Sequence, residues 1–272
     1  MTLQRGVRRT DARAASDIGR RARLELRFAC LSGRTVLAHA YAEPPFRIGR
    51  TFDEAGGVHM IMTSSAPGVF GGDCLEQIIH VESGARVRLT SQSALQAHPS
   101  ADDAVATLRS RYVVDEGGEL SCVWDPLIPF PGARVDQRFT IDLASSTKLT
   151  WSDAFMAGRE ARGERWTFAS LAHELRLTRN TRLDYVERFR IDAESAPARA
   201  WAASDACYFG STIVSSEQAD RNVAEAIQSR ARDCADLRAA ADIVAPRLLL
   251  VRLMSSDGPA FHRARQCLRP SL

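Results

Sequence analysis

Apolar and polar residues alternate along most of this chain, which is the pattern of β-strands that bury one face. The clearest case covers residues 74–90. Leu75, Ile79 and Val81 share one face of the first strand, and residues 82–84 (Glu-Ser-Gly) supply a turn. Alternation then resumes over residues 85–90, so the segment predicts two strands joined by a tight turn, which we interpret as a hairpin.

The same unit recurs further along the chain. Residues 114–120 and, more loosely, 141–149 repeat it at intervals of 33 and about 29 residues. Repeated units of this kind stack to bury a shared core. Further alternating runs precede and follow them. The sequence therefore predicts a mainly β fold of many short antiparallel strands in stacked hairpin repeats.

Helical spacing appears only late in the chain. Ser215 or Ser216 can cap a helix that ends near Arg232, and Ser256 or Asp257 can cap a terminal helix that ends near Leu268. The alanine-rich stretch 235–245 has no clear periodicity and is left unassigned. These runs add a small helical portion near the C-terminus.

Three irregular stretches interrupt the strand pattern. In residues 66–73 (APGVFGGD) the glycines permit positive φ or close backbone approach and leave Asp73 on a hinged loop. Residues 124–132 (WDPLIPFPG) hold three prolines in six residues, which exclude an interior strand. This rigid segment suits a docking surface, a channel wall or a crossover over the core. Residues 151–168 mix acids and arginines and form either an ion-paired solvated loop or a shaped loop.

Composition is that of an ordinary globular protein. The 272 residues are 45% hydrophobic and 25% charged, enough for a full core. There is no apolar run of the roughly 18 residues that a membrane span needs. The N-terminus lacks the apolar region of a signal peptide. We therefore expect a cytoplasmic location without membrane contact.

Charge is concentrated at the N-terminus. The chain carries +3 overall, whereas residues 1–27 hold eight arginines against three acids. We predict a disordered basic leader over residues 1–21 and a single β domain over residues 22–272. No later basic patch is interleaved with aromatic residues, so nucleic-acid binding is not expected. Lys148 is the only lysine, which excludes a P-loop and most Schiff-base chemistry.

No catalytic or metal motif is encoded locally. The six cysteines are at least 27 residues apart and the six histidines are well separated, which argues against a local zinc site. Carboxylates on separate segments can still converge in the fold, as an acid–base pair or as a weak divalent-cation site. The candidates are Asp73, Asp125, Asp153, Glu160 and Glu164.

The irregular stretches carry a family resemblance. PGVFGGD at 67–73 with the V-E-x-G-A-x-V-x-L-T run that follows it, WDPLIPFPGAR at 124–134 and AGREARGERWTF at 157–168 resemble the UreD (UreH) family of urease accessory proteins. The similarity runs from about residue 22 to Arg269. It implies a mostly β, non-enzymatic maturation factor that binds apo-urease, a UreF-type accessory protein and a UreG-type nucleotide-binding nickel carrier. It also implies an internal nickel path, with nickel bound only transiently and no tightly bound cofactor.

The resemblance assigns roles by motif position. The nickel path is expected to use Asp73, Asp125, Asp153, Glu160, Glu164 and His98. Partner binding is expected at Pro67, Gly68, Gly71, Gly72, Leu127, Ile128, Phe130 and Arg159. Gln96 and His98 stand where the family usually has a lysine and then an aromatic residue, and His98 can substitute as a nickel contact. The usual Pro-Pro-Gly-Gly opening is also altered, to residues 66–69 (Ala-Pro-Gly-Val).

Two other interpretations stay open. One is a hydrolase or isomerase on a β scaffold that uses converging carboxylates, with Asp73, Asp125 and Asp153 as candidates. The other is a structural adaptor whose acids never contact a metal ion.

Overall fold

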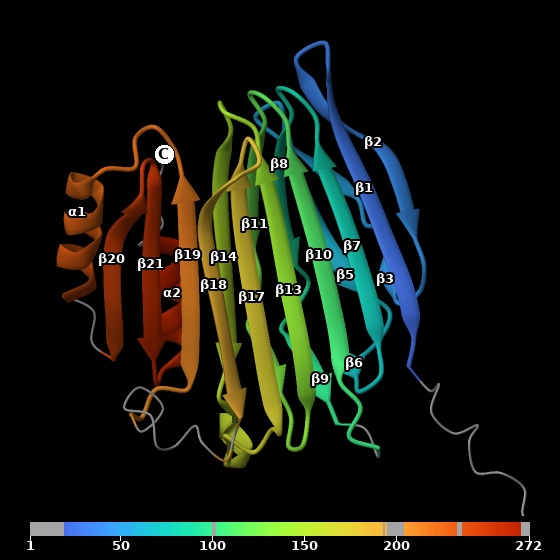
Figure 1. Ribbon diagram of the computed structural model, residues 1–272, viewed down its shortest axis with the longest axis vertical. Helices are drawn as coiled ribbons and strands as arrows, with labels where there is room; N and C mark the ends of the chain where they lie inside the picture. The colour runs from blue at the N-terminus through green and yellow to red at the C-terminus, as the bar shows by residue number, and fades with distance from the viewer. Residues whose placement is uncertain (1–18, 100–101, 193, 195–203, 233–235, 268–272) are drawn as a thin grey trace, which may run out of the picture.

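The computed structural model describes residues 19–99, 102–192, 194, 204–232 and 236–267. Two β-sheets stack face to face, and the larger one extends beyond the smaller at one side (Figure 1). Among the described residues, no helix is long and apolar enough to cross a membrane.

The smaller sheet has seven strands. They are β1 (Arg21–Leu31), β2 (Arg34–Ala42), β7 (Cys74–Val81), β10 (Ala106–Val114), β13 (Arg134–Leu143), β17 (Ser170–Arg179) and β18 (Arg182–Asp192). Their order across the sheet is β18-β17-β13-β10-β7-β1-β2.

The larger sheet has twelve strands. Its longer strands are β5 (Gly57–Ser64), β8 (Arg86–Ser91), β11 (Glu119–Val123), β14 (Lys148–Met156), β19 (Tyr208–Ser215), β20 (Leu237–Ala245) and β21 (Leu248–Ser255). Its short strands are β3 (Phe46–Arg47), β4 (Thr51–Glu54), β6 (Val69–Phe70), β9 (Leu95–His98) and β12 (Leu127–Pro129). The main order is β20-β21-β19-β14-β11-β8-β5-β3.

The repeats stack as predicted, but they are not hairpins. The two strands of each unit lie in opposite sheets, so the turn at residues 82–84 carries the chain from β7 to β8 across the core. Each strand pairs in parallel with the matching strand of the next unit: β7, β10 and β13 in one sheet, and β8, β11 and β14 in the other. The mainly β fold with late helices is confirmed, whereas the antiparallel pairing predicted for the repeats is wrong.

The physical reason lies in the apolar faces. An arch turns the apolar faces of its two strands toward each other, whereas a hairpin sets them side by side on one sheet. Stacking also gives the backbone N–H groups near the turns hydrogen-bond partners in the neighbouring arch. Gly84 N donates to Glu116 O (3.1 Å), and Glu119 N donates to Ala85 O (2.9 Å). Antiparallel pairs do occur outside the repeats, as in β1–β2, β17–β18 and β14–β19.

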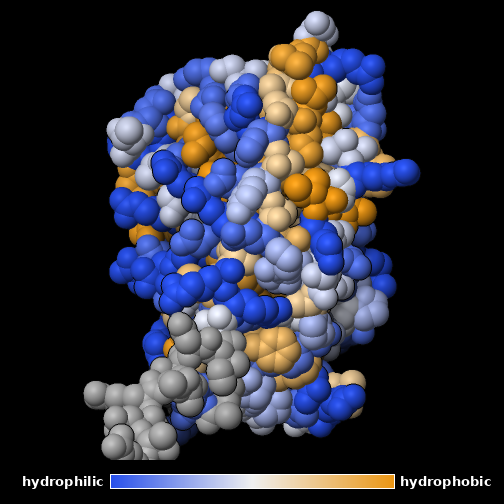
Figure 2. Space-filling view, turned by 90° about the vertical axis from the view of Figure 1, so that its right-hand side faces the viewer, coloured by the Kyte–Doolittle hydropathy of each residue, from blue (hydrophilic) through white to orange (hydrophobic). Residues whose placement is uncertain are grey.

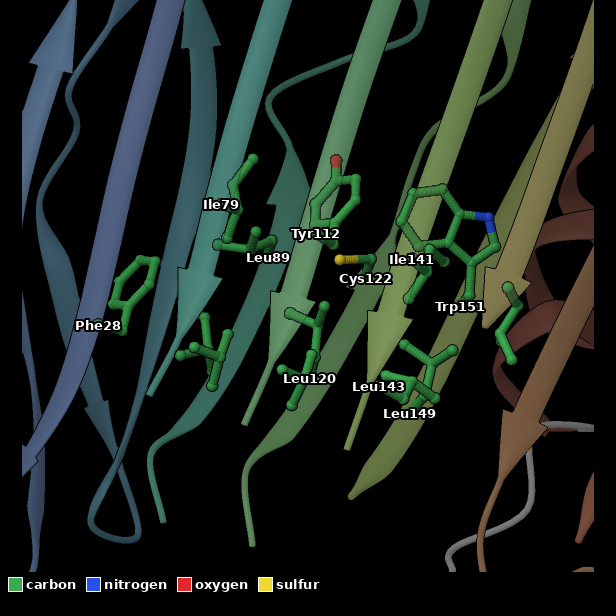
Figure 3. Packing of buried hydrophobic residues seen from close by; sticks show 14 of the residues in the cluster. Phe28, Ile79, Leu89, Tyr112, Leu120, Cys122, Ile141, Leu143, Leu149 and Trp151 are labelled. Carbon is green, nitrogen blue, oxygen red and sulfur yellow. The ribbon is translucent and has the colours of Figure 1, made fainter. Parts of the chain in front are cut away.

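The main core fills the space between the sheets (Figure 3). Phe28, Ile79 and Tyr112 enter from the seven-stranded sheet, and Leu89 and Trp151 come from the other. The Trp151 ring packs edge-on against Tyr112, with centroids 5.0 Å apart. Burying each such side chain contributes roughly 1.5–3 kcal/mol, so this layer is the main source of stability.

Both helices cover the extension of the larger sheet. The helix α1 (Arg221–Arg232) lies along the edge strand β20, and α2 (Gly258–Cys267) packs on the outer face against β21, β19 and β20. The capping side chains are Asp220, which accepts from Val223 N (2.9 Å), and Asp257, which accepts from Ala260 N (2.6 Å). Of the proposed caps, Asp257 is therefore correct, whereas the first helix starts later than Ser216. The unassigned alanine-rich stretch forms β20.

The N-terminal edge is partly apolar. Figure 2 looks onto this side of the molecule, where apolar side chains form a band among charged ones. Leu31, Tyr41 and Phe52 are exposed large apolar residues on β1, β2 and β4. A bulge opposite Arg27 and Phe28 interrupts the pairing of β2, a device that opposes edge-to-edge association.

The described structure begins at Gly19, inside the segment predicted as the leader. Residues 1–18 of the 1–21 segment lie outside the described residues. Arg20 binds Asp73, and Arg21 begins β1. The folded domain therefore includes these two arginines.

Candidate functional site

The three irregular stretches meet at one end of the sheet stack. In this group, which we call the motif end, β6 pairs with β9 (Phe70 with His98) and β9 pairs with β12. The two-stranded hairpin of β15 (Gly158–Arg159) and β16 (Glu164–Arg165) lies against β12, with the short 3-10 helix η1 (Glu160–Arg162) at its tip. Residues 151–156 of the third stretch belong to β14, so only its later part is a loop.

Asp73 closes the glycine loop. Its buried carboxylate forms an ion pair with Arg20 and accepts hydrogen bonds from Arg20 N (2.9 Å) and Phe70 N (2.8 Å). Burial acts to raise its pKa, but these hydrogen bonds and the Arg20 charge hold the pKa below its ordinary value. Arg20 also donates to Gly68 O (2.9 Å). Both carboxylate oxygens of Asp73 are thus already engaged within the chain.

His98 sits inside an aromatic and cationic stack. Its ring lies 4.5 Å from the Phe70 centroid in a stacked geometry and 4.5 Å from the Phe130 centroid edge-on. The Arg159 guanidinium lies 3.9 Å from the Phe130 centroid and pairs with Glu164 (2.6 Å). Burial lowers the pKa of His98, and the charges of Arg159 and Arg20 add to this effect. A hydrogen bond with the Pro67 backbone opposes it. The shift favours a neutral imidazole, and the buried Nε2 of His98 has no hydrogen-bond partner within the described chain.

The residues predicted to bind partners differ in exposure. Pro67 and Gly72 are exposed, whereas Gly68 and Leu127 are buried. The other four, Gly71, Ile128, Phe130 and Arg159, are half-buried. A partner at this end would touch the loop tips first, and Leu127 contributes to the interior instead.

Gly68→Ala should disturb the motif end strongly. A Cβ at this position would lie 2.2 Å from the carbonyl oxygen of Gln96 on β9, and that backbone cannot yield without breaking the β6–β9 pair. We expect a loss of about 2–4 kcal/mol in unfolding free energy by urea titration. Gly163→Ala is the matched control, because its Cβ would meet nothing within 4 Å and only a positive φ is strained. Equal losses in the two variants would contradict the close-approach argument.

Two cavities lie between the sheets and share part of their walls. One of about 480 Å³ opens beside β18, β20 and β21, and one of about 430 Å³ reaches the loops of the motif end. At their junction they share four lining residues, Leu127, Gln137, Asp153 and Ala154. We call these two adjoining cavities the passage.

A carboxylate and an imidazole face each other at this junction. The Oδ2 atom of Asp153 lies 3.7 Å from Nε2 of His173, whose Nδ1 accepts from the Gln137 amide (3.1 Å). Because Nδ1 is an acceptor, a neutral His173 carries its proton on Nε2, toward Asp153. Burial raises the pKa of Asp153, the His173 imidazole opposes this shift, and Glu187 adds to it.

His173, Gln137 and Glu187 were not among the predicted site residues. A signal did exist, because each occupies an inward position in a strand whose other inward residues are apolar, as in Leu171-x-His173-x-Leu175. Glu187 is held by Arg252 (2.8 Å) and by the Tyr185 hydroxyl (3.1 Å) at the wall of the larger cavity. A polar residue in such a row marks a cavity or a buried pair.

The six predicted nickel-path residues do not form one cluster. Asp153 lines both cavities, and Asp125, which accepts from Ser91 Oγ (3.1 Å), lines the smaller one. Glu160 is exposed on η1. Across the part of the chain that the structure describes, no three His, Cys, Asp or Glu side chains are placed to hold a metal ion together. Asp153 with His173 is the nearest approach to a cation site in the passage.

Fold and site together define a two-sheet β protein of stacked arches, with loop motifs gathered at one end and a polar junction inside. A sequence model described as UreD urease accessory protein matches residues 20–272. The chain belongs to the UreD family of urease accessory proteins.

Individual relatives agree with this assignment. The chain is 31% identical over 248 residues to a urease accessory protein UreD of Cupriavidus metallidurans, covering 87% of this chain and 83% of the relative. It is 33% identical over 168 residues to UreD of Sorangium cellulosum (62% and 53%), and 29% identical over 166 residues to UreH of Helicobacter pylori (60% and 62%). The chain spans a little over half the length of the first relatives that it matches.

Proposed function

We propose that this chain is a non-enzymatic urease maturation factor that binds apo-urease and lets nickel ions pass through its interior. The observation that carries the proposal is the passage, in which Asp153 lines both cavities and faces His173 on the wall of the larger one. In the assembly we propose, a UreF-type accessory protein and a UreG-type nucleotide-binding nickel carrier join it in the cytoplasm. Nickel is the cargo of this assembly and not a resident cofactor.

The chemistry of the junction suits a cation in transit. Carboxylate oxygen and imidazole nitrogen are both suitable ligands for a divalent first-row metal. His173 can offer Nε2 to an ion once its proton moves to Nδ1 and the Gln137 side chain turns its carbonyl oxygen toward that nitrogen. Two protein ligands hold an ion more weakly than the four of a closed structural site, so an ion that enters can also leave. The larger cavity is otherwise walled mainly by apolar side chains, among them Phe155, Phe189 and Phe209. The other carboxylate on this wall, Glu187, is already paired with Arg252 (2.8 Å), which leaves Asp153 as the carboxylate available to a cation.

The direct test is reconstitution. Apo-urease is co-expressed with the other accessory proteins, with and without this chain, and urease activity and bound nickel are measured. We expect both to depend on this chain. Equal activity and equal nickel content in its absence would reject the maturation role.

Ala154→Phe tests the passage itself. Ala154 lines both cavities at their junction, so a phenyl ring there should close the connection. We expect urease activation to fall about tenfold or more, equivalent to roughly 1.4 kcal/mol or more in a rate-limiting barrier. The control is Ala240→Phe, an exposed position on the rim of the larger cavity. Thermal unfolding and partner pull-down identify a simple folding defect, and full activation by a folded Ala154→Phe protein would argue against interior transit.

A further inference from the structure

The outer surface of the seven-stranded sheet is open. Both described helices pack on the other sheet, and in Figure 1 no described element lies in front of β1, β7, β10, β13, β17 and β18. Direct pairing, parallel from β1 to β17 and antiparallel between β17 and β18, aligns the outward side chains of these strands in straight rows. One row runs Arg23, Glu76, Arg109, Arg138, Glu174 and Arg188. The surface is therefore flat and regular.

Arginine dominates this surface, which we call the arginine face. Its outward arginines are Arg21, Arg23, Arg27, Arg109, Arg111, Arg134, Arg138, Arg176, Arg188 and Arg190. Its outward carboxylates are Glu25, Glu76, Asp136, Asp142, Glu174 and Asp192. The excess of four positive charges exceeds the +3 of the whole chain, so the remainder of the protein is not basic.

Ion pairs hold part of this charge in place. Arg109 and Arg138 share Asp136 (2.8 and 3.2 Å), and Arg188 pairs with Glu174 (2.9 Å). Within the described chain, Arg176 forms no ion pair. It shares a row of outward residues with Arg111, which lies two strands away. Arginines fixed in the plane of a sheet lose little conformational freedom when they bind a carboxylate on a second surface. The face is thus pre-arranged as well as charged.

The dimensions point to a folded protein as the ligand. Six strands spaced by about 4.8 Å, with four rows of outward residues, cover on the order of 600 Å². A standard protein interface takes about 800 Å² from each partner. A single peptide strand would leave most of the rows unused, and a duplex would meet carboxylates in every row.

We propose that the arginine face docks a flat, acidic surface of a folded protein partner. The proposal rests on the proposed function, because the partner belongs to the urease maturation assembly. Docking of this kind raises the association rate and fixes orientation, and it weakens steeply with salt. It would leave the motif end and the passage free for transfer.

The test uses Arg111→Glu/Arg176→Glu in the full chain. Both side chains are exposed, and the only ion pair lost, Arg111 with Asp142, is a surface pair of small energetic value. The control is Arg47→Glu/Arg50→Glu, which makes the same charge change at two exposed arginines outside the arginine face. Arg47 lies in β3 at the edge of the larger sheet, and Arg50 follows shortly after it. Pull-down of apo-urease and of the accessory partners is measured from about 50 to about 500 mM salt, because the screening of surface charges strengthens over this range.

We expect wild type and the control to capture the same partner with strong salt dependence. The face variant should bind that partner about tenfold or more weakly while unfolding at an unchanged temperature. Equal capture by both variants would overturn the docking proposal and leave the maturation role intact. Failure of the wild type to capture any partner would overturn both. Salt-sensitive binding of duplex DNA that only the face variant loses, with partner capture unchanged, would also overturn it.

Discussion

Asp73→Ala should lower the free energy of unfolding by about 2–4 kcal/mol, less than for a fully buried ion pair broken from one side, because the Arg20 side chain is 33% exposed. The Asp73 side chain is only 2% exposed, and its removal leaves the Arg20 guanidinium and two backbone N–H groups without their acceptor. Urea titration at pH 7 measures the loss. Asp53→Ala is the matched control, because Asp53 also pairs with an arginine, Arg34, but is 53% exposed. A control loss as large as that of Asp73→Ala would show that burial is not the cause.

The contribution of Asp73 should also depend on pH. Its pKa is lower in the folded chain than in the unfolded one, so the stabilisation is fully present above the unfolded value of about 3.9. It disappears as the pH falls through the folded pKa. The difference in unfolding free energy between wild type and Asp73→Asn should therefore be largest near pH 7 and shrink below about pH 4. A constant difference down to the acid transition would contradict this assignment.

Much of the fold could be predicted because alternation marks a buried face. It located the strands on both sides of the turn at residues 82–84 and the recurrence of that unit. It could not identify the strand lying opposite, because an arch and a hairpin bury the same residues of β7 and β8. The parallel pairing follows from how the units stack, which is a property of three or more units together.

The site was predictable in part. The motif segments were recognisable from their prolines and glycines, but the pairing of Phe70 with His98 depends on loops far apart in the chain. Asp153 was one of five equivalent acids until the stacking of β14 over β17 brought it opposite His173. Asp73 and Glu164 looked equally available, and each is engaged by an arginine that no spacing rule identifies.

Asp153→Asn should reduce urease activation about tenfold or more without destabilising the protein. In the proposed function the carboxylate is the anionic ligand where the two cavities adjoin, and an amide carries no charge to attract a cation. The pKa of Asp153 is raised by burial, so keeping it ionised at neutral pH costs folding stability, and this cost grows as the pH rises through the folded pKa. The neutral amide removes that cost. Thermal unfolding at pH 7 should therefore be unchanged or higher, which separates this variant from Asp73→Ala.

The raised pKa of Asp153 also predicts how urease activation should change with pH. A proton and a metal ion compete for the same carboxylate, so activation by the wild type should slow as the pH falls toward the Asp153 pKa, and Asp153→Asn should lose that limb. Glu160→Gln is the control, since this exposed acid lines neither cavity. If Asp153 and His173 act on one ion, the double variant with His173→Gln should be little worse than either single variant. Fully additive losses, or an unchanged pH profile in Asp153→Asn, would place the nickel path elsewhere in the molecule.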